Sequence, residues 1–150
     1  MISRTAEYAL RAVVVLGSSP GGPLATQQIA ARTRVPAGYL SKVLQALGRA
    51  GLVEAQRGLR GGFVLARSLD ELTILDVINA VDPRKRIDRC PLGLAAQGRR
   101  LCPLHRRLDQ GMAQLEALFG GTTIGQLLAE QDPSPPLCEM VAHGTSCTRS

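Results

Sequence analysis

Long apolar runs are missing from this 150-residue chain. No run approaches the roughly 20 apolar residues that a helix needs to cross a bilayer, which excludes a membrane-spanning class. We also expect no secretory signal, because Glu7 stands where its apolar core would begin and no cleavage site follows. We therefore expect a cytoplasmic protein with no membrane partner. Its four cysteines should be ligands or redox groups rather than structural disulfides.

The arrangements that catalysis needs are missing too. The chain has no paired acid and base and no nucleophile motif, and one histidine in a loop does not make a catalytic site. We therefore expect a protein that is not an enzyme. Its hydrophobic content of 45% is enough for a core, and its length fits one domain, or a compact domain with an oligomerisation element.

The net charge of +6 is unevenly distributed. Residues 1–72 carry nine Lys and Arg against four Asp and Glu, whereas residues 73–150 carry nine against eight. The excess of positive charge therefore lies in the first half, as expected if that half faces a polyanion. A solvated surface would look similar, and because only two of the 18 cations are lysine, an arginine-rich composition explains part of the basicity.

The first half predicts a winged helix-turn-helix. Apolar residues spaced by three and four predict a helix over 3–17. A short helix over 26–32 and a third helix over 37–50 are separated by only a few residues, as the helix-turn-helix requires. Two strands, 52–56 and 63–66, then enclose a basic, glycine-rich hairpin, which is the expected wing.

The second half predicts further helices. A capping box at Thr73 opens a helix to about residue 81, and a loop rich in proline and glycine follows over 82–103. A leucine stripe predicts a longer helix over 104–119, whose spacing suits packing across a dimer. A short helix over 122–129 and a poorly ordered tail complete the chain. The predicted fold class is mainly α with a small β-wing: a winged helix-turn-helix plus a long dimerisation helix.

Polar and basic side chains gather where a winged helix-turn-helix meets DNA. The first turn of the third helix, the recognition helix, offers hydroxyl and ammonium groups that can reach base edges or phosphates. In the hairpin, glycines let the backbone approach a phosphate, and arginines suit a minor groove or a phosphate pair. The alternative is that Tyr39 packs in the core, that Lys42 is merely solvated and that the hairpin is an ordinary basic one. The candidate DNA-binding residues are Thr26, Gln27, Tyr39, Ser41, Lys42, Arg57, Arg60, Gly61 and Gly62.

Two thiols and an imidazole occur within sixteen residues of the predicted loop and helix start. Thiolates and imidazoles are ligands for soft or borderline metals and for iron–sulphur clusters. The eleven residues between Cys90 and Cys102 are too many for a zinc knuckle of the Cys-x-x-Cys type. However, His105 follows Cys102 by three residues, a spacing that can place both side chains on one side of a helix start. The alternative is two inert, buried cysteines and a surface histidine.

A set of longer motifs resembles one family over about residues 1–130. The motifs are Thr-Ala-Glu-Tyr-Ala-Leu-Arg-Ala at 5–12, Tyr-Leu-Ser-Lys-Val-Leu-Gln at 39–45, Ala-Gly-Leu-Val at 50–53, Arg-Gly at 57–58 with Gly-Gly-Phe at 61–63, Leu-Asp-Val-Ile-Asn-Ala-Val-Asp at 75–82 and Cys-Pro-Leu-His at 102–105. Together they resemble the IscR- and NsrR-type regulators. The resemblance implies a homodimeric winged-helix transcription regulator. Many such proteins carry an iron–sulphur cluster between the dimerisation helix and the partner's N-terminal helix.

The resemblance also implies a ligand set. Cys90 and Cys102 match the first and last cluster cysteines, and His105 matches the histidine ligand of IscR-like members. Glu7 matches the carboxylate that NsrR-like members contribute from the other subunit. The chain departs from the pattern midway between the cysteines, where Leu-Ala-Ala-Gln at 94–97 replaces the usual third cysteine. This departure favours a [2Fe–2S] cluster over a [4Fe–4S] cluster.

The sequence therefore predicts a dimeric DNA-binding repressor of transcription that senses redox state, nitric oxide or iron–sulphur supply through a [2Fe–2S] cluster. Its DNA partner should be a double-stranded, inverted-repeat operator. One alternative is a cluster-free regulator that uses a thiol switch or a protein partner. Another is a winged-helix module that binds protein, for which an acidic or apolar wing is expected. The predicted domains are the winged helix-turn-helix at 1–67, the cluster loop and dimerisation helices at 68–131 and a disordered tail at 132–150.

Overall fold

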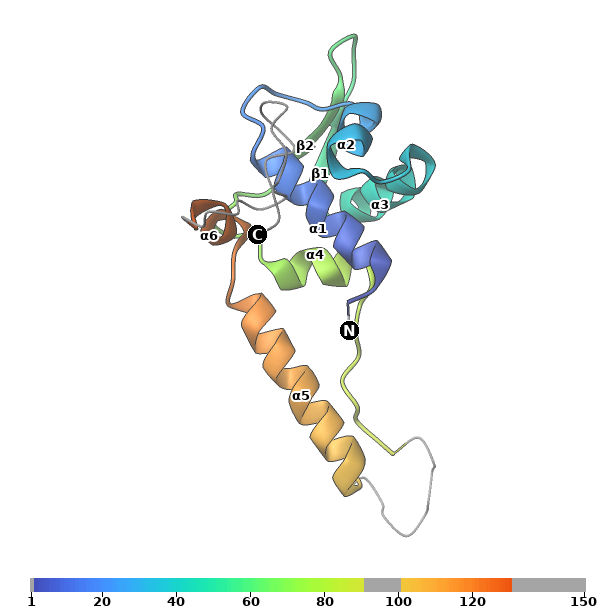
Figure 1. Ribbon diagram of the computed structural model, residues 1–150, viewed down its shortest axis with the longest axis vertical. Helices are drawn as coiled ribbons and strands as arrows, with labels where there is room; N and C mark the ends of the chain where they lie inside the picture. Colours follow the sequence, from blue (N-terminus) through green and yellow to red (C-terminus); the bar gives the residue numbers. More distant parts are fainter. Residues whose placement is uncertain (1, 91–100, 131–150) are drawn as a thin grey trace, which may run out of the picture.

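The computed structural model describes residues 2–90 and 101–130 (Figure 1). Its helices are α1 (Arg4–Gly17), α2 (Thr26–Thr33), α3 (Ala37–Arg49), α4 (Ile74–Val81), α5 (Pro103–Gly120) and α6 (Ile124–Ala129), and its strands are β1 (Val53–Gln56) and β2 (Gly62–Leu65). This order confirms the predicted fold class. The predicted tail, with Cys138 and Cys147, and the part of the predicted loop at 91–100 lie outside the described residues.

Helix α1 runs through the centre of the head, which comprises α1 to α4, the two strands and α6 (Figure 1). It begins where the hydroxyl of Ser3 accepts a hydrogen bond from the main-chain N–H of Ala6 at 3.1 Å. Because α2, α3 and α4 all pack against it, more of its surface is buried than one apolar stripe predicts. Ala12 and Val15 are fully buried as well, whereas Leu10, which the pattern assigns to the apolar face, is only partly buried.

The turn between α2 and α3 spans three residues. Arg34 adopts a left-handed conformation with φ of 54°, Val35 is buried, and Pro36 caps α3. These residues change the direction of the chain, so that α3 packs against α1 and α2. The four apolar positions at helical spacing along α3 are all buried, namely Leu40, Val43, Leu44 and Leu47. Gly51 follows the helix with φ of 70°, the left-handed conformation that ends helices.

The wing is an antiparallel pair in which Val53 faces Leu65 and Gln56 faces Gly62. A third segment extends it, because Leu24 and Phe63 exchange two main-chain hydrogen bonds, of 3.1 and 2.8 Å. The hairpin tip projects beyond the rest of the head (Figure 1). The wing therefore presents its tip to solvent, while its base is fastened to the segment that leads into α2.

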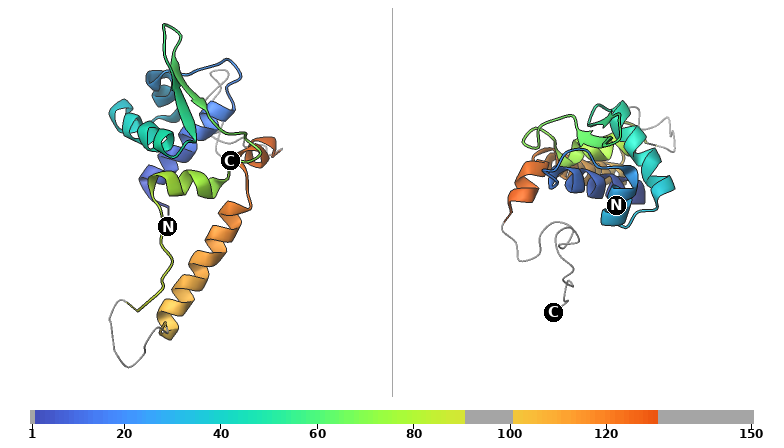
Figure 2. Two further views of the ribbon diagram at one scale, coloured as in Figure 1. Left: turned by 180° about the vertical axis from the view of Figure 1, so that it is seen from behind. Right: turned by 90° about the horizontal axis from the view of Figure 1, so that it is seen from above.

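Helix α5 extends away from the head and packs against α4 (Figures 1 and 2). It has no fully buried residue, and Leu104, Leu108 and Leu118 are 63%, 50% and 62% exposed. Among the described residues, no helix is both long and apolar enough to span a membrane. Within one chain, α5 therefore leaves these leucine side chains largely uncovered.

Helix α6 begins two residues later than the sequence predicts. The residues before it pair with the strand-like approach to α4, where Ile74 donates to Thr122 at 3.0 Å and Ile124 donates to Leu72 at 2.8 Å. Thr123 then caps α6 by accepting a hydrogen bond from the main-chain N–H of Gln126. The predicted start at residue 122 is therefore wrong, because Thr122 and Thr123 are used in pairing and capping.

Candidate functional site

The first candidate site is the surface formed by α3 and the wing. Tyr39 lies at the seam between α3 and α1 and is 40% exposed. Its phenolic oxygen is 2.5 Å from the hydroxyl of Thr5, and its ring meets the ring of Tyr8 edge-on with centroids 5.5 Å apart. Tyr39 is therefore neither a core residue nor a free one. Sequence reasoning missed Thr5, because nothing local links positions 34 residues apart.

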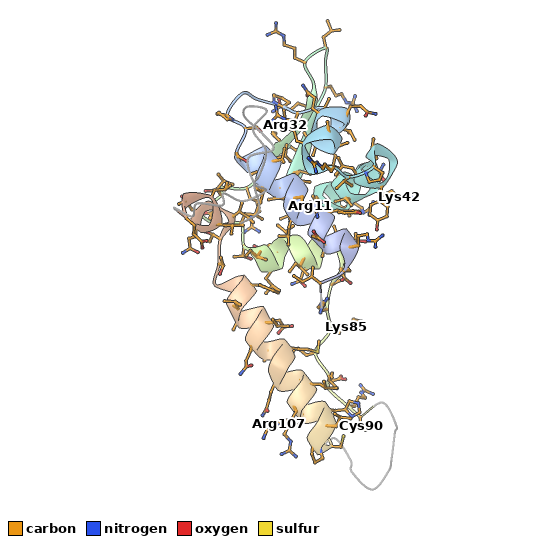
Figure 3. The ribbon with its side chains drawn as sticks, in the orientation of Figure 1. Arg11, Arg32, Lys42, Lys85, Cys90 and Arg107 are labelled. Atoms are coloured by element: carbon orange, nitrogen blue, oxygen red, sulfur yellow. The ribbon has the colours of Figure 1, made fainter. Side chains whose placement is uncertain are left out.

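The neighbouring recognition-helix residues differ in how available they are. Lys42 is exposed and lies on the outer side of α3 (Figure 3). Ser41 is partly buried, and its hydroxyl donates to the carbonyl of Ala37 in the preceding turn at 3.0 Å. Because Ser41 has already used its donor within the helix, it retains only acceptor capacity toward a base or a solvent molecule.

The hairpin tip carries exposed arginines on a sterically constrained backbone. Arg57 and Arg60 are both exposed at the tip. A Cβ on Gly61 would lie 2.4 Å from the carbonyl oxygen of Gln56, and one on Gly62 would lie 2.4 Å from the main chain of Leu24. The two glycines are thus explained by close backbone contacts within the wing, and a DNA contact by either stays a prediction.

The two remaining candidates lie in the first turn of α2. Thr26 is partly buried and Gln27 is exposed. The neighbouring Gln28, which was not singled out from the sequence, accepts a hydrogen bond from the main-chain N–H of Ala25 at 2.8 Å and so caps this helix. Gln27 does not make this capping bond, and its exposed side chain is more accessible to DNA than that of Thr26.

The second candidate site brings Cys90, Cys102 and His105 together. Their ligand atoms all lie within 4.8 Å of one another, and each residue is partly buried. Nδ1 of His105 is 3.1 Å from Sγ of Cys102 and 3.7 Å from Sγ of Cys90. Cys102 is the N-cap of α5, so the spacing of three residues places His105 in its first turn, as the sequence predicted. Cys90 approaches the same end of α5 from the segment that follows α4 (Figure 3).

The start of α5 makes Cys102 an acidic thiol. The main-chain N–H and the imidazole of His105 lower the pKa of Cys102 most, partial burial opposes them more weakly, and the main-chain N–H of Leu104 adds a smaller lowering. Thiolates bind metals and attack disulfides, whereas thiols do neither well. The arrangement therefore favours the form of Cys102 that metal binding or thiol exchange requires.

Glu7 is not part of this group within one chain. It lies in the first turn of α1 and forms an ion pair with Arg11 of the same helix. Helix α1 is in the head, whereas Cys90 is at the far end of α5 (Figures 1 and 3). Only a second subunit could bring a Glu7 to these ligands, which is how the sequence prediction was framed.

Sequence reasoning also missed an ion-pair network beside this site. Arg86 forms two hydrogen bonds with Asp109 of α5, of 2.6 and 2.5 Å, and a longer one with Glu116 at 3.4 Å. Charged residues are common on surfaces, so no local pattern distinguishes Arg86 from its neighbours Lys85 and Arg89. The one available signal is that Asp109 follows His105 by one helical turn.

The winged fold and the cysteine–histidine group can now be compared with known proteins. Residues 2–130 match the family Rrf2, described as iron-dependent transcriptional regulator. The chain belongs to the Rrf2 family. It is thus a transcriptional regulator and not an enzyme, as its sequence predicted.

Several known proteins are similar to this chain along most of its length. The transcriptional regulator IscR of Escherichia coli is 29% identical over 126 residues, which are 83% of this chain and 78% of the relative. Among solved structures, IscR of T. potens has a TM-score of 0.71 at 22% identity and covers 85% of both chains. CymR of B. subtilis, named as the global cysteine regulator, has a TM-score of 0.72 at 25% identity over 88% of this chain and 98% of its own.

Proposed function

We propose that this Rrf2-family regulator is a homodimeric repressor in the cytoplasm whose affinity for DNA depends on a [2Fe–2S] cluster. The observation that carries the proposal is the gathering of two thiols and an imidazole at the start of α5, with all ligand atoms within 4.8 Å of one another. The similarity to IscR of Escherichia coli supports an iron–sulphur regulator over an unrelated metal site.

The donor set fits the cluster chemically. Soft thiolates are the usual ligands of iron–sulphur clusters, and imidazole replaces thiolate in centres of raised reduction potential. The lowered pKa of Cys102 favours the thiolate that a ligand must supply. When bound, such a cluster supplies a centre that exchanges one electron and reacts with nitric oxide. In this chain Cys90, Cys102 and His105 would hold it.

A fourth ligand has to come from elsewhere, and we assign it to Glu7 of the partner subunit. The three donors of one chain leave one position of a [2Fe–2S] unit unfilled. Glu7 is exposed, and its ion pair with Arg11 is a solvent-exposed pair within one helix, which costs little to exchange for another partner. A ligand set that spans both subunits would couple the cluster to the angle between the two DNA-binding heads.

A spectroscopic experiment tests the cluster. Protein isolated without oxygen should show visible absorption together with matching iron and sulphide. Cys90→Ala and Cys102→Ala should each abolish the absorption, whereas His105→Ala or Glu7→Ala should leave it weaker or shifted. Cys138→Ala and Cys147→Ala are the matched controls and should change little. Protein that stays colourless after reconstitution would reject the cluster.

One specific observation favours a second candidate, a thiol switch without a cluster. The sulphur atoms of Cys90 and Cys102 lie within 4.8 Å, and the pKa of Cys102 is lowered, which together favour a reversible disulfide. The missing third cysteine agrees with this reading. A colourless protein whose DNA affinity changes on oxidation, and no longer does so in Cys102→Ala, would establish the switch in place of the cluster.

DNA binding is expected to involve the wing and the recognition helix. Arg57→Ala and Arg60→Ala should each weaken binding to many sequences and reduce the salt dependence by about one phosphate contact. Changes at Tyr39 or Ser41 should instead alter sequence preference. Arg107→Ala removes the same charge at the far end of α5 and is the matched control (Figure 3). No binding to a duplex library at low salt, with or without the cluster, would contradict the DNA assignment.

A further inference from the structure

Cys90 reaches the ligand group on a segment with little structure of its own. Residues 83–90 follow the end of α4 and form neither helix nor strand. Within the described part of the chain, no main-chain to main-chain hydrogen bond joins this segment to another element. The position of Cys90 must therefore be fixed by side chains if its sulphur is to stay beside His105.

Asp109 of α5 supplies a fixed point for this segment. Its carboxylate accepts a hydrogen bond from Nε of Arg86 to Oδ1 at 2.6 Å and another from Nη2 to Oδ2 at 2.5 Å. The main-chain N–H of Ile87 donates a third, to Oδ1 at 3.1 Å. A two-pronged guanidinium–carboxylate pair combined with a main-chain bond restrains both the side chain and the backbone of the segment, which a single surface ion pair does not do.

This fixed point determines how the segment is aligned with α5. Asp109 follows His105 by four residues, so both side chains lie on one face of the helix, one turn apart. Ile87 contacts Asp109, and three residues later Sγ of Cys90 lies 3.7 Å from Nδ1 of His105. Three extended residues span up to about 10 Å, which easily covers the roughly 5.4 Å of one helical turn. The contact at Asp109 therefore brings Cys90 level with His105.

The Arg86–Asp109 ion pair is also partly shielded from solvent. The side chain of Asp109 is only 19% exposed, and that of Arg86 is 42% exposed. The guanidinium of Arg86, aided by the N–H of Ile87, keeps the pKa of Asp109 below its usual value, and so these contacts favour the charged carboxylate. Glu116 adds a longer contact to the same guanidinium at 3.4 Å.

We propose that Arg86 and Asp109 are positioning residues that hold Cys90 within reach of Cys102 and His105. The proposal rests on the proposed function in one respect, namely that these three residues form the sensing site. It does not depend on which group occupies the site, because the Arg86–Asp109 pair acts on the chain without a cluster.

The effective concentration of the Cys90 thiol at Cys102 measures this positioning directly. The full chain carrying Cys138→Ala and Cys147→Ala is equilibrated, without iron, in glutathione buffers. One glutathione disulfide takes two electrons and two protons from the two thiols, which join as a disulfide while two molecules of glutathione are released. The equilibrium constant reports how often the two sulphurs meet, and mass spectrometry counts the disulfide.

Arg86→Gln and Asp109→Asn should each lower this effective concentration by about tenfold, since an untethered segment samples a larger volume. The double variant should lose no more than either single variant, because the two residues act as one unit. Arg86→Lys keeps the charge without the two-pronged geometry and should fall between. Arg89→Gln is the matched control, because the side chain of Arg89 is 82% exposed and its Nε atom lies 3.7 Å from a carboxylate oxygen of the adjacent Asp88.

Two further measurements separate positioning from folding and from cluster binding. Thermal unfolding of each variant should stay within a few degrees of the parent chain, since the pair lies on the surface. In reconstituted protein, the cluster absorption of Arg86→Gln and Asp109→Asn should decay faster in a chelator than that of Arg89→Gln.

The outcomes distinguish this proposal from the proposed function. Unchanged effective concentrations in folded Arg86→Gln and Asp109→Asn overturn the positioning role, even if the protein binds a cluster. Lowered values in a chain that never binds a cluster support the positioning role and reject the cluster. A loss in Arg89→Gln as large as in Arg86→Gln also overturns it, because the effect would then belong to charge alone.

Discussion

At the residue scale, Cys102 shows how a helix start controls chemistry. It occupies the N-cap position of α5, where the main-chain N–H groups of Leu104 and His105 lower the pKa of its thiol, that of His105 most. Helix N-termini stabilise anions because their first N–H groups have no partner within the helix. The lowered pKa thus follows from the position of the cysteine in the sequence, one residue before the proline that opens the helix.

The rate at which Cys102 is alkylated tests this account. Because the folded pKa is lowered, the thiolate persists as the pH falls below about 8.5, where free thiols lose it. In folded, cluster-free protein, an alkylating reagent should therefore modify Cys102 at a pH where the same residue reacts slowly in urea. Peptide mass spectrometry measures both rates. His105→Ala should raise the pKa only in part, since the main-chain N–H at that position remains. Identical pH profiles in folded and unfolded protein would contradict the account.

At the element scale, the wing depends on the tight contact between β2 and the segment before α2. A Cβ at Gly62 would lie 2.4 Å from the main chain of Leu24, which cannot move without breaking the hydrogen bonds between Leu24 and Phe63. Gly62→Ala should therefore destabilise the fold by about 1–3 kcal/mol, measured by urea unfolding. Gly21→Ala, with no neighbour within 4 Å of its new Cβ, should change stability little. Equal stability of the two variants would refute the steric explanation.

The sequence predicted well those features that depend on residues close together in the chain, such as helix caps and the buried face of a helix. Thr73 caps its helix as expected, and the apolar residues at helical spacing in α3 form its buried face. The start of α6 was missed, because Thr122 pairs with Ile74 across a long stretch of chain. At the metal-ligand group, the sequence predicted Cys102 and His105 from their spacing, since both belong to one helix start.

Contacts between residues far apart in the sequence could not be predicted from local sequence patterns. The arrival of Cys90 at His105, fifteen residues away, was expected from family resemblance rather than from the residues themselves. No local pattern names the partner of Asp109 or the partner of Tyr39, because each contact joins separate elements through ordinary polar side chains. Which polar residues meet is decided by how α5 and α1 pack, and periodicity alone does not determine that packing.

At the scale of the whole molecule, α5 carries an uncovered apolar surface. Leu104, Leu108 and Leu118 are at least half exposed. A hollow of about 210 Å³ between α4 and α5 continues this surface, and its lining includes Leu75, Ile78, Met112, Leu115 and Phe119. Exposed apolar surface of this kind marks a binding face, and a helix without buried residues gains its stability from a partner. A second copy of the chain, packed along α5, accounts for both.

Leu108→Glu tests that interface against a matched neighbour. In a two-fold dimer the substitution acts twice, and each leucine contributes about 1.5–3 kcal/mol when buried, so the dissociation constant should rise at least about 100-fold. Gln110→Glu adds the same charge two residues away, at an exposed polar position of α5, and should leave the dimer intact. Light scattering across a concentration series measures both, with circular dichroism to verify the helices. DNA affinity should fall together with dimerisation, because a monomer contacts only one half of an inverted repeat. A monomeric parent chain at micromolar concentration, or equal behaviour of the two variants, would remove α5 as the interface and leave its leucines to another partner.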